Sequence, residues 1–366
     1  MSTDTVSGVW TYSIELCSAL QADHEIILAT MGAPLSREQR EEVRRLRVDV
    51  RESTWRLEWM DDPWADVAAA GEWLLAIAEH ESPDIVHLNS YAHAALPWSA
   101  AVVVACHSCV LTWWKAVHGT APPLHWERYR RIVTAGLQSA DVVVSPTVAL
   151  LDELKRLYGP FRRERVIPNG RRPDDFRPRP KEPHVLSAGR LWDAARNVST
   201  LVAAAPSVRW PVYVAGETAA PDGRTVELPP NVRALGPLSP ATLADRMSRA
   251  AIYALPARYE PFGLSAVEAA LSGCALVLGD IPSLHEVWGP AALYVPPEDP
   301  DVLAFALNRL VAAERARKRL SRAAMERARE LTPTHTAALY RALYAELGAA
   351  VVAPPAHPLS ALRAAV

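Results

Sequence analysis

Short apolar runs of strand length alternate with amphipathic helical patterns along most of the chain, and this alternation constrains the fold more than any other feature. The runs are rich in Val, Ile and Leu. Strands that alternate with helices in this way are typical of βαβ units and a parallel sheet. The predicted strands are 24–28, 84–88, 101–105, 142–144, 165–167, 185–187, 212–215, 252–255, 275–278 and 293–295, and the clearest helices are 9–20, 64–79, 148–157 and 302–313.

The chain is too long for one ordinary core. At 366 residues, half of them hydrophobic, it suits two α/β domains. The stretch FRPRPKEP at 176–183 holds three prolines and four charges, which is typical of an extended linker. We therefore predict domains at 1–177 and 178–335, a helix around 336–348 that packs back on the first domain, and a low-complexity tail at 349–366.

Charge and cysteine content exclude several classes of protein. The net charge of −2 gives no general field for nucleic acid or anionic membranes. Four cysteines without a secretory signal favour a cytoplasmic protein without disulfides. The basic amphipathic stretch WERYRRIV at 126–133 is compatible with weak contact to a membrane surface. Most of the 39 basic residues are arginine, so a single arginine is a weak sign of function.

The most informative stretch, ARYEPFGLSAVEAALSG, follows a predicted strand. Glu260 and Glu268 lie eight positions apart, but Pro261 and Gly263 force a loop between them. Glu260 is then a loop residue, and Glu268 lies near the unpaired amides of a helix N-terminus. A purely structural alternative is open, because Ser265 and Glu268 also fit a capping box.

The motif E-P-F-G-L-S-x-x-E-A resembles the donor site of retaining glycosyltransferases of family 4, the glycosyl transferases group 1. The resemblance implies two Rossmann-like domains that face each other across a cleft, the GT-B fold. It also implies transfer of a sugar from a nucleoside-diphosphate sugar to a hydroxyl of a glycan, glycolipid or small molecule, as in bacterial polysaccharide biosynthesis. The resemblance also implies that the transferred sugar is contacted by Glu260, Phe262, Gly263 and Leu264. It implies that Glu268 binds the nucleotide ribose.

A second donor signature is SAGRLWDAARN, directly after a predicted strand. A departing diphosphate needs fixed cations, and Arg190 and Arg196 suit that role without a metal or other cofactor. Arg196 stands where the resembled family usually has lysine. Gly189 precedes Arg190 and is assigned to the same donor site. The family's nucleobase contacts map to 216–217 and 235–238, which includes Leu238.

The acceptor half offers fewer specific signals. His107, at the end of strand 101–105, matches a family histidine near the anomeric carbon. Its flanking cysteines, Cys106 and Cys109, form one C-x-x-C pair, too few ligands for a closed metal site. Polar residues after strand 84–88, namely Asn89, Tyr91 and His93, are further candidates for the acceptor site, and Asn169-Gly170 matches a family turn.

The N-terminus departs from the family pattern. The family has a hydrophobic strand before the first helix and then a turn with two glycines that approaches the donor phosphates. Here Ser7 replaces the first glycine and could donate its hydroxyl to phosphate, Gly8 is the second glycine and is assigned to the donor site, and the strand is missing or reduced to 1–3. Loss of a central strand would hollow out the core, so we expect a start upstream of this one. Two other functions stay open: a nucleotide-sugar epimerase or hydrolase, and a partner subunit with an impaired site.

Overall fold

The computed structural model describes all residues except 7, 220–222, 224, 226–227 and 351–366. The chain divides into two compact units, one of Met1–Thr112, Thr120–Pro168 and the chain from Pro333 onward, the other of Trp113–Gly119 and Asn169–Thr332. The division lies at Pro168, so the prediction of a first domain reaching 177 was wrong: residues 169–177 belong to the second unit. Most of the predicted tail lies outside the described residues.

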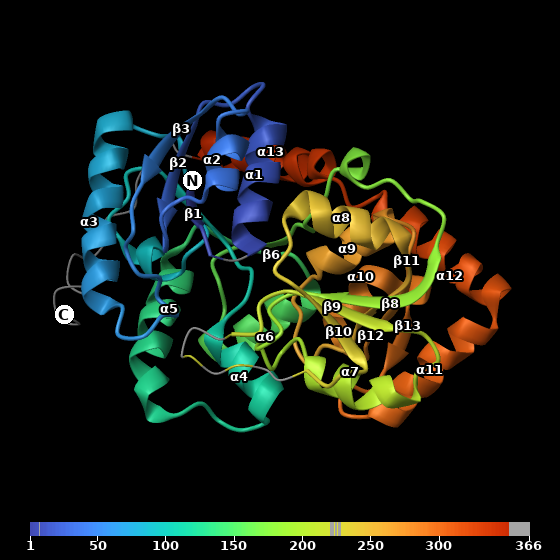
Figure 1. The fold of residues 1–366 in the computed structure, drawn as a ribbon. Helices are drawn as coiled ribbons and strands as arrows, with labels where there is room; N and C mark the ends of the chain where they lie inside the picture. Colours follow the sequence, from blue (N-terminus) through green and yellow to red (C-terminus); the bar gives the residue numbers. More distant parts are fainter. Residues whose placement is uncertain (7, 220–222, 224, 226–227, 351–366) are drawn as a thin grey trace. The chain divides into compact units, whose positions relative to one another are not determined.

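The first unit contains parallel strands in two adjoining sheets (Figure 1). One sheet has the order β1 (Ser2–Asp4), β2 (Ile26–Met31), β3 (Val48–Glu52). The other has the order β4 (Ile85–Leu88), β5 (Ala101–Ala105), β6 (Val142–Ser145), β7 (Glu164–Val166). β5 and β6 are buried along their whole length, as expected for central strands of a parallel sheet that is covered on both faces.

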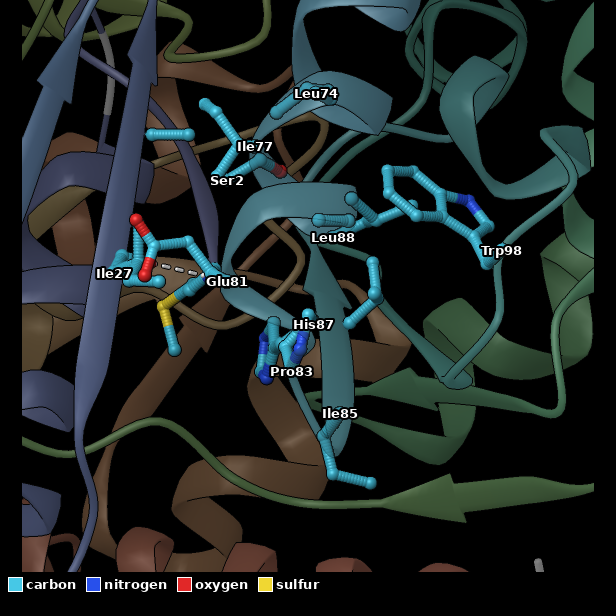
Figure 2. Close-up of a pocket in the computed structure, with 14 residues that line it drawn as sticks. Ser2, Ile27, Leu74, Ile77, Glu81, Pro83, Ile85, His87, Leu88 and Trp98 are labelled. Atoms are coloured by element: carbon cyan, nitrogen blue, oxygen red, sulfur yellow. Dashed lines mark hydrogen bonds between the residues drawn. The ribbon is translucent and has the colours of Figure 1, made fainter.

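The boundary between the two sheets, called the seam, lies between the short first strand and the end of β4. β1 comprises only Ser2–Asp4, which agrees with the predicted truncation, and its side chains are buried. Across the seam, the backbone N–H of Asn89 donates to Ser2 Oγ at 3.0 Å, and the Asn89 amide donates to the Ser2 carbonyl at 2.6 Å. A cavity of about 60 Å³ lies beside these contacts, lined by Ile27, Leu74 and Leu88 among others (Figure 2). Hydrogen bonds that involve the side chains of Ser2 and Asn89 thus take the place of the backbone hydrogen bonds that a longer strand would form.

Helices cover the sheets of the first unit and close its core. They are α1 (Gly8–Leu20), α2 (Arg37–Val43), α3 (Trp64–Glu81), α5 (Glu127–Ser139), α6 (Val148–Tyr158), α13 (Pro333–Ala350) and the first turn of α4 (Val110–His118). α13 lies beside α1 in Figure 1, and Tyr340 and Leu343 share one buried cluster with Tyr12 and Leu16. The final helix therefore packs on the first unit, although it follows the second in sequence.

The second unit is a single parallel sheet of six strands with helices on both faces. Its order is β10 (Val232–Gly236), β9 (Val212–Ala215), β8 (Glu182–Ala188), β11 (Ala250–Leu255), β12 (Ala275–Gly279), β13 (Leu293–Val295). The helices are α7 (Val198–Ala204), α8 (Pro240–Arg249), α9 (Leu264–Leu271), α10 (Pro282–Trp288), α11 (Pro300–Ala312) and α12 (Glu314–Ala328). Val185 and Leu186, neighbours on β8, enter different core clusters, because successive side chains of a strand point to opposite faces.

Strand order in the second unit locates a binding region. The order in which strands are added reverses between β8 and β11, the two central strands. Ligands of open α/β sheets bind outside the carboxyl ends of the strands at such a point. Within the described part of the chain, each helix is too short or too polar to cross a bilayer.

Candidate active site

The loops after β8 and β11 bring a cation and a carboxylate together. Arg196, in the segment after β8, donates a hydrogen bond from Nη1 to Oε2 of Glu260, in the loop after β11. Only 8% of the Glu260 side chain and 25% of the Arg196 side chain are exposed. Burial works to lower the pKa of Arg196, but the charges of Glu260 and Asp193 outweigh it and the pKa is raised. The guanidinium is therefore a permanent cation at this edge of the sheet.

Glu260 is also held by its own loop. The Phe262 N–H donates to Oε1 of Glu260 at 3.3 Å, and the Ser283 hydroxyl donates to the Glu260 carbonyl at 2.6 Å. The Phe262 side chain is buried in the core with Leu284, so only its backbone can face a ligand. These contacts fix the carboxylate before any substrate arrives.

Two glycines directly follow β8 and β9, so no side chain covers the backbone at the ends of these strands. Gly189 and Gly216 have φ of +144° and +143°, a conformation that side-chain-bearing residues rarely adopt. A Cβ on Gly216 would lie 1.7 Å from the Gly189 carbonyl oxygen, whereas a Cβ on Gly189 would meet the Arg196 side chain at 3.6 Å. The close approach of these two loops requires glycine at position 216.

Helix α9 begins without the predicted capping box. Its N-cap is Gly263, with φ of 90° and no side-chain hydrogen bond, so the alternative that placed Ser265 at the cap was wrong. Glu268 instead forms an ion pair with Arg171, with 3.0 Å between Oε1 and Nε. Burial raises the pKa of Glu268, although Arg171 opposes the shift. A capping function therefore does not explain this carboxylate.

Three further predicted donor residues of the second unit are partly exposed. Arg190 is 41% exposed, forms an ion pair with Asp193 at 3.2 Å and lies over the Trp192 ring. Leu264 and Leu238 pack, partly exposed, against the core cluster of Phe262. The predicted donor residues thus lie in the second unit, except Gly8, which lies in the first, and Arg190 is more exposed than Arg196.

Arg171 was missed by the sequence analysis. It follows the quoted Asn169-Gly170 turn directly, and its backbone N–H donates to the Leu331 carbonyl at 3.0 Å. Its guanidinium lies over the Phe176 ring, 5.3 Å from the centroid. In a chain rich in arginine, only its position after a family turn offered a signal.

In the first unit, His107 lies at the end of β5 beside the end of β4. Its Nε2 is 2.7 Å from Oδ1 of Asn89, and the Tyr12 ring packs edge-on at 4.4 Å between centroids. Burial lowers the pKa of His107 to about 4, so the imidazole is neutral at pH 7. A neutral imidazole that donates to an amide keeps its other nitrogen as an acceptor.

Two other candidates of the first unit have internal roles. His93 is buried, with Nδ1 2.9 Å from Ser90 Oγ and Nε2 3.0 Å from the Val67 carbonyl. Tyr91 is buried and donates to the Ser108 carbonyl. Their contact with an acceptor stays a prediction, and Asn89 is the member of that group that reaches His107.

The remaining predictions concern cysteines and the N-terminal turn. Cys106 and Cys109 are both buried, and Cys109 Sγ lies 2.7 Å from the Tyr158 hydroxyl. Among the described residues, no three His, Cys, Asp or Glu side chains gather as a metal site. Gly8 is the first residue of α1, and a Cβ there would meet nothing within 4 Å. Ser7 lies outside the described residues.

Two family models match the two halves of the chain. Glycosyltransferase Family 4 matches residues 6–175, and Glycosyl transferases group 1 matches residues 182–313. The chain belongs to glycosyltransferase family 4. The second model covers the loops after β8 and β11, so the donor motif lies inside the matched region.

Curated relatives of this family 4 chain are bacterial glycosyltransferases. Glycogen synthase of Mycobacterium tuberculosis is 30% identical over 273 residues, which are 67% of this chain and 64% of that protein. The match thus spans about 64% of the relative's length. D-inositol 3-phosphate glycosyltransferase of Nocardioides sp. is 37% identical over 128 residues, 33% of this chain and 28% of that protein.

Solved structures show that this family 4 chain has the GT-B fold. Sucrose-phosphate synthase from Thermosynechococcus elongatus matches with a TM-score of 0.76 and 22% identity, over 93% of each chain. HepE of Anabaena, in complex with UDP and glucose, matches with a TM-score of 0.77 and 14% identity, over 95% of this chain and 100% of that one. Both predicted Rossmann-like domains are therefore confirmed as folds.

Proposed function

We propose that this chain transfers a sugar from a nucleoside-diphosphate sugar to an acceptor hydroxyl, with retention at the anomeric carbon and without a metal ion or cofactor. The observation that carries the proposal is the buried Arg196–Glu260 pair at the carboxyl ends of β8 and β11. It supplies a fixed cation and a fixed carboxylate where an open parallel sheet binds its ligand.

The leaving group accounts for the cations. When the bond between the anomeric carbon and the diphosphate oxygen breaks, negative charge grows on that oxygen, and Arg196 and Arg190 stabilise it. The backbone amides that open α9 add a partial positive charge. Gly189 and Gly216 leave the adjacent backbone bare for close approach of phosphate. With these fixed cations, the proposed reaction needs no metal ion.

The contacts of Glu260 bear on the route by which the proposed retention is reached. A double displacement needs a carboxylate free to attack the anomeric carbon, but Glu260 is tied to Arg196 and to the Phe262 amide. We therefore favour attack of the acceptor hydroxyl on the face that the diphosphate leaves. The acceptor oxygen forms the new bond to the anomeric carbon, and its proton passes to the departing phosphate oxygen. His107, neutral and held by Asn89, orients the reacting sugar in this proposal.

The relatives support sugars and nucleotides as ligands. HepE of Anabaena is described in complex with UDP and glucose, and the curated relatives act as glycogen synthase and as D-inositol 3-phosphate glycosyltransferase. We propose a carbohydrate or glycolipid acceptor, and no nucleic-acid partner. UDP and UDP-glucose are the first ligands to test, with GDP and ADP forms beside them.

The test combines binding and transfer. A thermal-shift panel of nucleoside diphosphates and their glucose and mannose conjugates identifies the donor, because a ligand that binds only the folded state raises the melting temperature. The selected donor is then incubated with candidate acceptors, with and without a chelator, and the anomeric configuration is read by NMR. We expect His107→Ala to keep the thermal shift and lose turnover, and Glu268→Ala to lose the shift.

Three results would replace this proposal. Donor consumed without an acceptor would indicate a nucleotide-sugar epimerase or hydrolase. Complete loss of transfer in chelator would contradict metal independence. A chain that binds no nucleotide or nucleotide-sugar would act as a partner subunit with an impaired site.

We also propose that the chain works in the cytoplasm and makes weak contact with anionic membrane surfaces. Leu124, just before α5, is 90% exposed, and Arg131 on α5 is exposed as well. An exposed apolar side chain that precedes a helix with basic residues is compatible with surface contact with lipid. Flotation with phosphatidylglycerol vesicles tests the contact; Leu124→Ser should reduce it, and equal flotation with phosphatidylcholine would contradict the electrostatic part.

A further inference from the structure

The carboxylate assigned to the nucleotide ribose already has a partner inside the same unit. The Arg171 Nε and the Glu268 Oε1 are 3.0 Å apart, and the two side chains are only 14% and 16% exposed. Arg171 comes from the segment before β8, whereas Glu268 comes from α9. The pair therefore connects two segments far apart in the sequence at a largely buried position.

The guanidinium of Arg171 is itself held in place. The Phe176 ring lies under it at 5.3 Å, and the Arg171 backbone N–H donates to the Leu331 carbonyl at 3.0 Å. An arginine that packs on an aromatic ring and is fixed through its backbone loses little further freedom when it binds a carboxylate. Its position is thus set independently of Glu268.

A carboxylate has more acceptor sites than this contact uses. Its two oxygens offer about four lone-pair directions, and the contact between Arg171 Nε and Oε1 uses one of them. The other directions can accept from a vicinal diol, such as the 2′- and 3′-hydroxyls of ribose. Acceptance from a diol is strongest when the carboxyl is charged and its orientation is fixed.

We propose that Arg171 is a positioning residue that holds Glu268 charged and oriented for the ribose hydroxyls of the donor nucleotide. This inference rests on the proposed function. Burial raises the pKa of Glu268 and therefore favours its neutral form, and Arg171 opposes that shift. Without Arg171, the side chain would accept more weakly from ribose and would be free to rotate.

The test measures recognition of ribose rather than overall affinity. Titration calorimetry compares UDP with 2′,3′-dideoxy-UDP, and GDP and ADP with their dideoxy forms, for wild type and variants. We expect Arg171→Leu to bind the ribonucleotide about ten-fold more weakly and to lose most of the preference over the dideoxy form. Arg171→Lys should restore part of both. A merely structural role would lower both affinities together and leave their ratio unchanged.

Two controls isolate the pair. Arg172→Leu removes a neighbouring arginine that pairs with Asp175 and is half exposed, and it should leave the ratio as in wild type. Glu268→Gln should lower the ratio as Arg171→Leu does, and the double variant should lose little more, because both changes break one interaction. Circular dichroism checks that each variant is folded.

The outcomes separate the two proposals. If the wild type binds a nucleotide and Arg171→Leu keeps the ratio, the role of Arg171 is wrong and the proposed function stands. If the effects of Arg171→Leu and Glu268→Gln on the ratio simply add, the positioning role is likewise overturned. If the wild type binds none of the three nucleoside diphosphates, the proposed function fails and this inference fails with it.

Discussion

Arg196 binds the Glu260 carboxylate through its guanidinium, joining the loop after β8 to the loop after β11. Both side chains are mostly buried, and Glu260 receives a further hydrogen bond from the Phe262 amide. A carboxylate buried in this way depends on its cation, because the protein cannot replace the water that the charge has lost. The same contact therefore serves the fold of the second unit and its proposed chemistry.

Removal of the cation alone should destabilise the protein. Arg196→Met leaves Glu260 buried without its partner, and we expect a loss of about 3 kcal/mol in the free energy of unfolding. Urea denaturation followed by fluorescence measures it. The control is Arg179→Met, which breaks the half-exposed pair with Asp245 and should cost less than about 1 kcal/mol. Equal losses in the two variants would contradict a buried, mutually dependent pair.

Gly216 should tolerate no side chain. In Gly216→Ala the new Cβ would lie 1.7 Å from the Gly189 carbonyl oxygen, in a backbone conformation with φ of +143°. We expect a loss of about 2 kcal/mol or more in stability, and loss of nucleotide binding in the thermal-shift assay. Gly348→Ala is the control: nothing lies within 4 Å of its Cβ, so its melting temperature should match wild type or exceed it. Unchanged nucleotide binding in Gly216→Ala would show that this glycine is not part of the donor site.

The sequence predicted strands that are unbroken apolar runs better than strands that carry charged residues. Strands 101–105, 212–215 and 293–295 have the predicted bounds, because each is an unbroken apolar run, although 293–295 lies at a sheet edge and is only partly buried. β3 and β10 were missed, since each lies at a sheet edge and carries exposed charged residues that interrupt the apolar pattern. The first strand was predicted to be truncated, and the structure shows that Ser2–Asp4 still pairs with β2.

The sequence indicated which site residues lie together where each stands in a local motif, and it did not where the partners are distant. Glu260 and Arg196 each stand in a recognisable stretch, so their meeting at the switch point could be predicted from strand order. The pairing of Glu268 with Arg171 could not, because a capping box explains the same local pattern and only tertiary structure selects between them. Glu58, buried in the first unit, gave no signal in the sequence.

Glu58 should make stability depend on pH. Its carboxylate accepts from the backbone amides of Tyr91 at 2.9 Å and Ala92 at 2.7 Å, and burial raises its pKa to about 7. The folded protein thus holds this proton more tightly than the unfolded chain does. The free energy of unfolding should therefore fall as pH rises from about 4.3 to 7, and then level off above pH 7.

The variant Glu58→Gln isolates this titration. Since glutamine does not titrate, the stability of wild type relative to the variant should decrease by up to about 3 kcal/mol between pH 4.5 and pH 8. Urea denaturation at several pH values measures the difference. A difference that stays constant across this range, or that grows in favour of wild type at high pH, would contradict the raised pKa.

The cavity at the seam of the first unit should accept added methyl groups. Ala29, on β2, is buried and lines this cavity of about 60 Å³, beside the short first strand. Ala29→Val fills part of the space with a residue that favours strands, and we expect a gain of about 1 kcal/mol in the free energy of unfolding. Ala254→Val places the same methyl groups in β11, a fully buried central strand, where overpacking should cost about 1–3 kcal/mol. If Ala29→Val destabilises the protein as Ala254→Val does, the seam is packed as tightly as an unbroken sheet, and the truncated strand has not weakened the core.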